Sequence, residues 1–196
     1  ARDGLPASFK SGRPERVRVN GSDETDDRTA GVADEGERAG NPNRRERVER
    51  RPRQGIGNSM HRWYRIRNPV RVAINYAVIL LCRISPSLVL KRFLLRRLGV
   101  TVGTGVAFGL ESTPDVFWPE LITVEDDAII GYDATILCHE FLRDEYRTGA
   151  VTIREGAMIG ASAIVLPGVE VGENAQVAAN SLVTEDVPPD TTVAGV

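Results

Sequence analysis

Residues 153–188 read IREGAM, IGASAI, VLPGVE, VGENAQ, VAANSL and VTEDVP, six consecutive units of six residues with no slip in frame. Every unit opens with Ile or Val, and the fifth place always holds Ala, Val or Ser. A β-strand turns its side chains to alternate sides with a period of two, so a period of six indicates one short strand plus one turn per unit. Stacked coils of such units form a parallel β-helix, in which the opening aliphatics line the interior.

The same rule appears upstream in two other frames. Residues 124–135 read VEDDAI and IGYDAT, and a weaker trace begins at Val102 with VGTGVA and FGLEST. Gly and Asn occur at the remaining turn places, where a positive φ costs them least. An ordinary β-sandwich shows turn signals about every 8–12 residues, not every six. We therefore predict an all-β fold, a parallel β-helix, over residues 99–196.

The residues before the repeat fall into two segments of different character. Residues 1–59 carry 13 basic and 11 acidic side chains and one aromatic residue, so they bury too little apolar surface to offset the entropy of ordering. We predict that they are a disordered tail or an over-called N-terminus with the native start at Met60. Residues 60–98 carry nine basic and no acidic side chains, whereas residues 99–196 carry three basic and 16 acidic ones.

Prolines punctuate the basic segment and predict helices over 70–84 and 87–98, because proline is tolerated in a first helical turn. In the second helix four leucines form a stripe and the basic residues lie off it (Leu90, Leu94, Leu95 and Leu98 against Lys91, Arg92, Arg96 and Arg97). Two interpretations stay open. The stripe caps the first coil or packs in an oligomer, or the segment 60–98 makes a peripheral contact with anionic lipid.

The six-residue frame breaks conspicuously at residues 137–152, LCHEFLRDEYRTGAVT, which are polar and unrepetitive and must leave the β-helix as a loop. Functional groups concentrate on loops that a rigid scaffold positions. His139, the only histidine of the predicted body, stands at the root of this loop. Because an imidazole can accept a proton from an attacking hydroxyl or amine near neutral pH, we predict His139 as the general base of an acyl transfer.

Residues 130–196 resemble the hexapeptide-repeat sugar and antibiotic O-acetyltransferases, such as the maltose and galactoside acetyltransferases. ILCHEF from Ile136 and MIGASAIVLPGVEVGENAQVAANSLVTEDVPPDTTVAGV from Met158 carry the resemblance. It implies a left-handed β-helix and a homotrimer with active sites between subunits. It also implies acetyl-CoA as the co-substrate, a saccharide hydroxyl as the acceptor and His139 as the base.

The resemblance further implies that the pantetheine arm of coenzyme A runs along the backbone of the last coils. This assigns four residues to the cofactor, with Thr184 nearer the nucleotide end, although all four are also ordinary repeat positions (Gly160, Ala161, Ala179 and Thr184). The family commonly has Lys after this threonine, whereas this chain has Glu185, which would repel a phosphate.

The loop offers candidates for acceptor binding in Glu140, Arg143 and Tyr146, although a charged loop in solvent is the favoured account of most such residues. A carboxylate would be expected to orient His139 and stabilise its imidazolium. Glu140 is too near His139 in sequence to be assigned that role, and the orienting residue stays open.

Two other functions compete with acyl transfer. A carbonic anhydrase on the same fold needs three histidines around zinc, and this chain has only His61 and His139. Cys82 and Cys138 lack metal-ligand spacing, so we predict no metal site and a reducing, cytoplasmic location. A non-catalytic trimeric scaffold would need neither His139 nor acetyl-CoA and is the main alternative. We expect no nucleic-acid partner.

Overall fold

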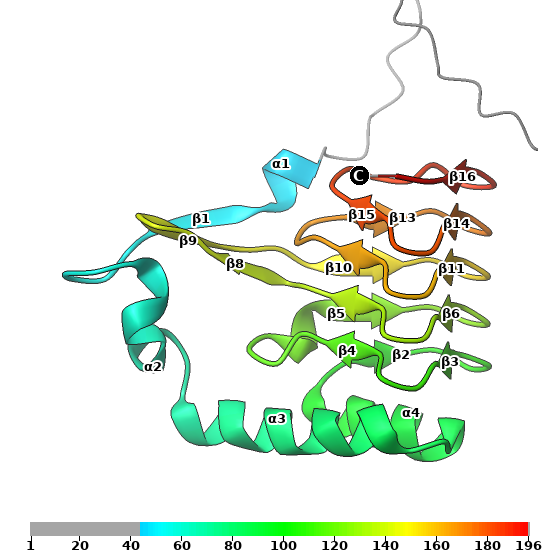
Figure 1. Ribbon diagram of the computed structural model, residues 1–196, viewed down its shortest axis with the longest axis horizontal. Helices are drawn as coiled ribbons and strands as arrows, with labels where there is room; N and C mark the ends of the chain where they lie inside the picture. The colour runs from blue at the N-terminus through cyan, green and yellow to red at the C-terminus, as the bar shows by residue number, and fades with distance from the viewer. Residues whose placement is uncertain (1–43, 196) are drawn as a thin grey trace, which may run out of the picture. The chain divides into compact units, whose positions relative to one another are not determined.

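The computed structural model describes residues 44–195 of the 196-residue chain. Residues 1–43, the larger part of the predicted tail, lie outside the described residues. From residue 101 onward the chain winds into a left-handed parallel β-helix, and its coils stack one above another along the helix axis (Figure 1). The predicted fold is therefore confirmed.

Three parallel sheets form the three sides of the β-helix, and each coil contributes one short strand to each side. The first side contains β2 (Thr101–Val102), β5 (Ile122–Val124), β10 (Val151–Ile153) and β13 (Glu170–Val171). The second contains β3 (Ala107–Phe108), β6 (Ile129–Ile130), β11 (Met158–Ile159), β14 (Gln176–Val177) and β16 (Thr192–Val193). The third contains β4 (Thr113–Pro114), β7 (Thr135–Ile136), β12 (Ile164–Val165) and β15 (Leu182–Val183).

The opening aliphatics of the repeat stack into the predicted internal columns. Ile153 pairs with Val171, Ile159 with Val177 and Val165 with Val183, so one regular coil advances 18 residues. These six side chains are at most 5 % exposed. Burial of such columns is the main stabilising contribution to the coil stack, because it removes aliphatic surface from water on every side.

The turn places of the repeat are as regular as the strands. The fourth place takes a positive φ in successive units, which glycine and asparagine adopt most readily (Gly156, Ser162, Gly168, Asn174 and Asn180, with φ between 54° and 81°). The fifth place is buried at the corner of the coil, where little room is left for a side chain (Ala157, Ala163, Val169, Ala175, Ser181 and Val187). The choice of small residues there follows from the crowding of backbone at each corner.

Enlarging a corner residue should destabilise the stack. We expect Ala163→Leu to lower the free energy of unfolding by about 1–3 kcal/mol, because a close-packed corner must distort to admit the extra atoms. Chemical denaturation followed by circular dichroism measures the change. Ala150→Leu, at an exposed position, is the matched control and should leave stability nearly unchanged. Equal effects of the two changes would show that the corner is not tightly packed.

Two helices close the lower end of the coil stack, as predicted from the prolines. The first is α3 (Pro69–Ile84), capped by the side chain of Asn68, and the second is α4 (Leu88–Leu98), capped by Ser87 and ended by Gly99 at φ 103°. No helix within residues 44–195 is both long and apolar enough to cross a membrane.

The predicted stripe of α4 is partly wrong. Leu95 and Leu98 are buried, but Leu90 is exposed and Lys91 is the residue that faces inward. The Lys91 ammonium donates hydrogen bonds to the carbonyl oxygens of Phe108 (3.1 Å) and Gly109 (2.7 Å). The lowest coil has no coil beneath it to supply N–H donors, and a buried carbonyl without a donor is costly, so a lysine is favoured over a leucine there.

Arg92 and Arg96 also donate hydrogen bonds to the lowest coil. Arg92 donates to the carbonyl oxygen of Val106 at 3.1 Å, and Arg96 donates to those of Val102 and Gly103 at 2.7–3.0 Å. The inner face of α4 therefore caps the first coil, and its basic side chains supply the hydrogen-bond donors.

The expected disorder of residues 44–59 is not what the structure shows. This segment contains α1 (Arg44–Arg47), β1 (Glu49–Pro52) and the start of η1 (Ser59–Arg62), which α2 (Trp63–Ile66) follows. Strand β1 pairs antiparallel with β9 (Glu145–Thr148). Backbone N–H and C=O groups make this pairing, so a polar composition does not reveal it.

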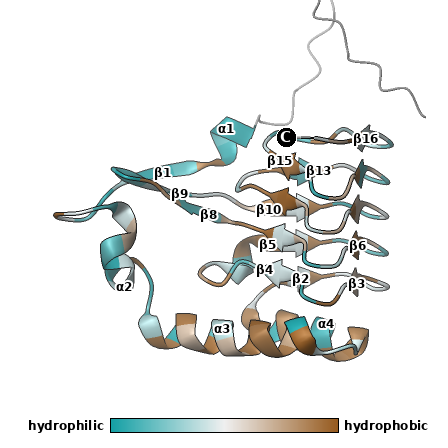
Figure 2. Ribbon diagram, viewed as in Figure 1, coloured by the Kyte–Doolittle hydropathy of each residue, from teal (hydrophilic) through white to brown (hydrophobic). Residues whose placement is uncertain are grey.

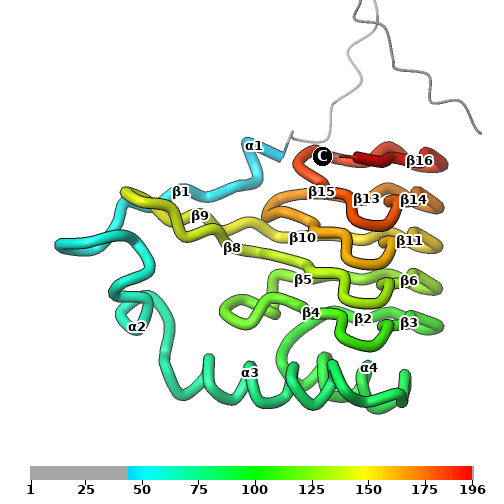
Figure 3. The backbone as a smooth tube through the Cα atoms, in the orientation of Figure 1, coloured from blue at the N-terminus to red at the C-terminus, as the bar shows by residue number. Residues whose placement is uncertain are grey.

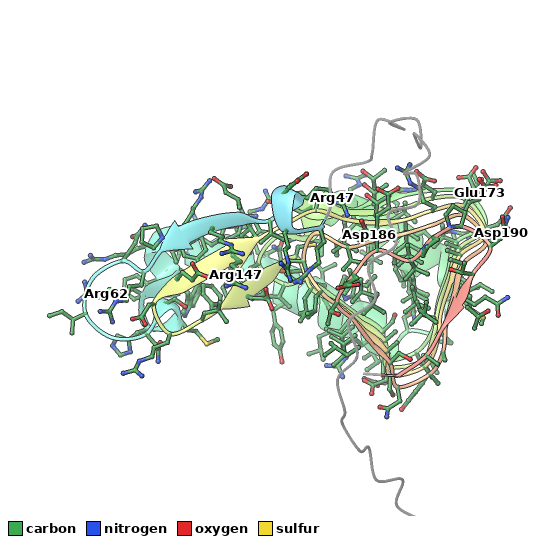
Figure 4. The ribbon with its side chains drawn as sticks, turned by 90° about the horizontal axis from the view of Figure 1, so that it is seen from above. Arg47, Arg62, Arg147, Glu173, Asp186 and Asp190 are labelled. Carbon is green, nitrogen blue, oxygen red and sulfur yellow. The ribbon has the colours of Figure 1, made fainter. Side chains whose placement is uncertain are left out.

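Residues 137–150 leave the β-helix much as predicted, but they form a hairpin rather than an irregular loop, and Val151 and Thr152 already belong to β10. Strand β8 (His139–Phe141) pairs with β9, with His139 opposite Thr148 and Phe141 opposite Tyr146. With β1 at its other edge the hairpin is a three-stranded sheet that projects from one corner of the triangular coils (Figure 4).

Candidate active site

Two insertions interrupt the coils at the same corner, between the third and the first side (Figure 3). A regular coil advances 18 residues, as from Ile153 to Val171, whereas Val102 to Val124 takes 22 residues and Val124 to Ile153 takes 29. The shorter insertion follows β4 and contains η2 (Pro119–Leu121), and the longer one is the β8–β9 hairpin. Parallel pairing of β4 with β7 places the roots of both insertions one above the other.

The stacked roots bring Asp115 and His139 together. Asp115 follows β4 directly, and His139 begins β8 one coil above it. Oδ2 of Asp115 lies 2.5 Å from Nδ1 of His139, although the two residues are 24 positions apart in sequence. The Asp115 side chain is fully buried, and the His139 side chain keeps 15 % of its surface exposed.

Asp115 is held rigidly by the backbone. Its Oδ1 accepts hydrogen bonds from the N–H groups of Phe117 and Trp118, both at 2.8 Å, in a turn that aspartate commonly forms with its own following residues. Its Oδ2 accepts from the N–H of Cys138 at 2.6 Å in addition to His139. With four acceptor contacts filled, the carboxylate has little freedom to rotate away from the imidazole.

The Asp115 contact fixes which nitrogen of His139 is basic. An ionised carboxylate can only accept, so Nδ1 of His139 must carry the proton in this pair. The neutral ring then has its lone pair on Nε2, at the side away from Asp115. This arrangement of a buried carboxylate, an imidazole and a free Nε2 suits the removal of a proton from a bound hydroxyl or amine.

Aromatic side chains surround the imidazole. The ring centroids of Phe117, Trp118 and Phe141 lie 4.8, 5.2 and 5.0 Å from that of His139. All three rings are partly exposed, and they come from both insertions. A few polar groups among apolar and aromatic walls are the usual character of a small-molecule site. The sequence prediction missed Asp115, Phe117 and Trp118.

Cys138 lies beside His139 in sequence but is completely buried in the bend between β7 and β8. Burial raises the pKa of its thiol well above the ordinary value. Because a raised pKa keeps the sulfur protonated at and above neutral pH, Cys138 is a poor nucleophile. We expect the folded chain to resist alkylation of Cys138 by iodoacetamide at pH 8, with the denatured chain as the reactive control, read by mass spectrometry. Rapid labelling of the folded chain would contradict this.

The predicted acceptor residues occupy three different environments. Glu140 follows His139 in a β-strand, so its side chain points to the opposite face, where it lies 3.6 Å from Arg44. Arg143 is exposed in the turn of the hairpin. Tyr146 is buried and stacks on Trp118 at 6.5 Å between ring centroids, which makes it part of the wall behind the aromatic cluster.

The four predicted cofactor residues lie along the two edges of the third side. Gly160 and Ala161 form the corner between the second and third sides, and Ala179 is stacked on them one coil above. Thr184 is exposed directly after β15, at the corner from which the hairpin projects two coils below. A Cβ at Gly160 would lie 2.5 Å from the backbone nitrogen of Ala179, so close stacking of coils already accounts for that glycine.

Metal coordination was predicted to be absent. Among residues 44–195, no group of three or more His, Cys, Asp or Glu side chains is arranged to hold an ion.

Proteins that are similar in sequence are described as acetyltransferases. The family model "Bacterial transferase hexapeptide (six repeats)" matches residues 150–185. Over 150 residues the chain is 41 % identical to the Bacillus subtilis (strain 168) protein named "Putative acetyltransferase YvoF", which covers 76 % of this chain and 87 % of that protein. Over 132 residues it is 40 % identical to a Staphylococcus aureus (strain MSSA476) protein of the same description, with coverage of 67 % and 82 %.

Solved structures share the fold. The hexapeptide-repeat acetyltransferase VCA0836 of Vibrio cholerae O1 biovar eltor, complexed with acetyl coenzyme A, aligns with a TM-score of 0.52 at 21 % identity, over 64 % of this chain and 82 % of that one. A galactoside acetyltransferase in complex with coenzyme A aligns with a TM-score of 0.50 at 21 % identity, over 65 % and 77 %.

Proposed function

This chain belongs to the hexapeptide-repeat acetyltransferases, and from that premise we propose that it moves an acetyl group from acetyl-CoA to a hydroxyl of a saccharide or a related small acceptor, with His139 as the general base. As an acyltransferase it needs a group that deprotonates the attacking atom. The contact of 2.5 Å between Asp115 and His139 is the observation that carries the proposal. A non-catalytic scaffold would not require a buried carboxylate aligned with a partly exposed imidazole.

The proposed reaction is a direct transfer. His139 Nε2 accepts the proton of the acceptor hydroxyl while the oxygen attacks the thioester carbonyl to form a tetrahedral intermediate. The intermediate collapses by breaking the bond between carbon and sulfur, and the sulfur takes the proton from Nε2, so coenzyme A leaves as the thiol and the neutral imidazole is restored. Asp115 holds Nδ1–H throughout and stabilises the imidazolium that forms. Direct transfer, without a covalent acyl-enzyme, agrees with the protonated, buried thiol of Cys138, which is a poor nucleophile.

Acetyl-CoA is proposed to lie along the third side of the β-helix. The outer surface of that side presents Ile164, which is 39 % exposed, between the corner of Ala161 and Ala179 and the corner of Thr184. The partly exposed side chains of Ile164 and Leu182 offer apolar surface to the pantetheine arm. Glu185 beside Thr184 disfavours phosphates, whereas Asp186 is paired with Arg47, so we place the nucleotide away from Glu185.

A hydroxyl on a ring-shaped acceptor is favoured by the surroundings of the base. Phe117, Trp118 and Phe141 offer partly exposed apolar surface against which the carbon face of a sugar can pack, with its hydroxyls left for polar contacts. The resemblance of the sequence to sugar O-acetyltransferases supports the same acceptor class. A homotrimer is proposed on that resemblance, with each acceptor site completed by a neighbouring subunit.

Coenzyme A thiol release tests the proposal. Purified full chain is incubated with acetyl-CoA and a panel of saccharides, polyols and amino compounds, and the free thiol is followed with a chromogenic disulfide. We expect release that depends on a hydroxyl-bearing member of the panel. Release with amines alone would show that the acceptor is an amine and not a hydroxyl. Absence of acceptor-dependent release across the whole panel would favour the non-catalytic scaffold.

A further inference from the structure

The outer faces of α3 and α4 form an apolar surface at the lower end of the coil stack. Both helices lie flat against the first coil, so their outer faces share one plane (Figure 2). Nine large apolar side chains are between 39 % and 68 % exposed there (Val70, Ile74, Leu80, Leu81, Ile84, Leu88, Val89, Leu90 and Phe93). Isolated exposed apolar residues are ordinary, but a contiguous group of this kind marks an interaction surface.

The capping role of these helices does not explain this surface. Capping uses the opposite faces, where Val72, Asn75, Ile79 and Cys82 of α3 and Lys91, Leu95 and Leu98 of α4 are buried. Solvent exposure alone would favour polar residues on an outer face. On α3 the outward positions between Val70 and Ile84 are instead occupied by alanine and large aliphatic residues.

The charge around the surface is positive. Segment 60–98 carries nine basic and no acidic side chains, while residues 99–196 carry three basic and 16 acidic ones. Five of the nine are engaged with the body, either as donors to the lowest coil or in ion pairs with glutamates (Lys91, Arg92 and Arg96, and Arg67 and Arg83). Arg71 and Arg97 are exposed beside Val70 and Ile74, and the Arg97 guanidinium lies 4.9 Å from the centroid of the Phe93 ring. The molecule therefore has a basic, apolar end and an acidic body, and an anionic partner would attract the first and repel the second.

A second copy of the chain fits this surface poorly. Two such faces brought together would oppose one set of arginines with another, and like charges in contact disfavour association. A neutral apolar partner would leave the arginines without counter-charge. A partner with an apolar interior and a negatively charged surface would accommodate the apolar side chains and also neutralise the arginines.

We propose that the α3–α4 surface docks on the anionic surface of a phospholipid bilayer, with the apolar side chains inserted at the level of the headgroups and the arginines on the phosphates. Helices that lie in the plane of the interface, with apolar residues on one side and basic residues at its rim, bind membranes in this way. The coil axis would stand on the bilayer, and the acidic body would face the solvent. This docking does not depend on acyl transfer.

Vesicle flotation tests the docking. Full chain is mixed with vesicles of phosphatidylcholine alone or with added phosphatidylglycerol, and the fraction that floats is measured at about 0.15 M and about 1 M salt, where the screening length shortens from about 8 to about 3 Å. We expect flotation with the anionic vesicles at the lower salt, and a marked fall at the higher salt or without the anionic lipid. Failure to float with anionic vesicles at the lower salt overturns the proposal.

Variants of the exposed side chains locate the contact. Ile74→Glu combined with Ile84→Glu should lower the partition coefficient on the order of 100-fold, because two apolar groups no longer insert. Arg71→Gln combined with Arg97→Gln should lower it about 25-fold, since each basic residue near an anionic surface contributes about five-fold. Ile56→Glu, at a residue 86 % exposed between β1 and η1, is the matched control and should float like the parent.

Folding and assembly are read in the same samples. The substituted residues are exposed, so circular dichroism and the thermal midpoint should be unchanged. If the Ile74→Glu, Ile84→Glu variant instead lowers the oligomeric mass measured by light scattering while flotation stays at the parent level, the surface is an interface between copies and the docking is overturned.

Discussion

His139→Ala is expected to lower kcat for acetyl transfer by about 10²–10⁴-fold, because the acceptor hydroxyl loses the group that takes its proton. Binding of acetyl-CoA should be retained, since the proposed cofactor surface lies along the third side of the β-helix and not on the imidazole. Thiol release gives the rate, and calorimetry or fluorescence quenching gives cofactor affinity.

The other histidine of the chain is the matched control. His61 lies exposed in η1, and we expect His61→Ala to keep the parent rate. Parent turnover in His139→Ala would remove the assignment of the base, whereas a loss of cofactor affinity equal to the loss of rate would indicate a binding role for His139 instead.

Asp115→Asn is expected to lower kcat over the same range, about 10²–10⁴-fold. The amide has a single oxygen, which the N–H groups of Phe117 and Trp118 hold at the Oδ1 position. Its nitrogen would then face Nδ1 of His139 as a donor and favour the tautomer with the proton on Nε2. In that tautomer His139 cannot accept the proton of the acceptor.

Stability separates this positioning role from a structural one. Asp115→Asn also leaves the buried N–H of Cys138 without an acceptor, which we expect to cost about 1–3 kcal/mol of unfolding free energy. Activity is therefore compared at a temperature where denaturation shows the variant to be folded. If folded Asp115→Asn keeps the parent kcat and the parent pH–rate profile, Asp115 only accepts backbone hydrogen bonds and does not position His139. Asp127→Asn, at an exposed turn, should change neither measurement.

The period of six predicted the β-helix because it is a local rule repeated many times. Each aliphatic from Ile153 to Val183 needs only its own strand and turn to be placed, and every coil repeats the same solution. The helices over α3 and α4 were predicted for a similar reason, since Pro69 and Pro86 mark their starts within a few residues. The predicted stripe of α4 was partly wrong because Lys91 faces inward and donates hydrogen bonds to carbonyl oxygens of the lowest coil. The periodicity of a helix does not report such a tertiary contact.

The candidate base and its partner illustrate the same division. The break in the repeat after Ile136 singled out His139. A second break, between the unit that ends at Thr113 and the one that begins at Val124, contains Asp115 and could have drawn attention to it. Only the parallel pairing of β4 with β7 shows that both breaks leave at one corner, one coil apart.

The sequence by itself determined the coil, its interior columns and the histidine at the exit of the hairpin, because these depend on side chains within one or two units of each other. The tertiary structure alone decided that Asp115 orients His139, that β1 pairs with β9, and that Lys91 faces inward. Those contacts join residues 17 to 99 positions apart through buried polar groups and backbone hydrogen bonds. Partners of this kind leave no periodic pattern in the sequence.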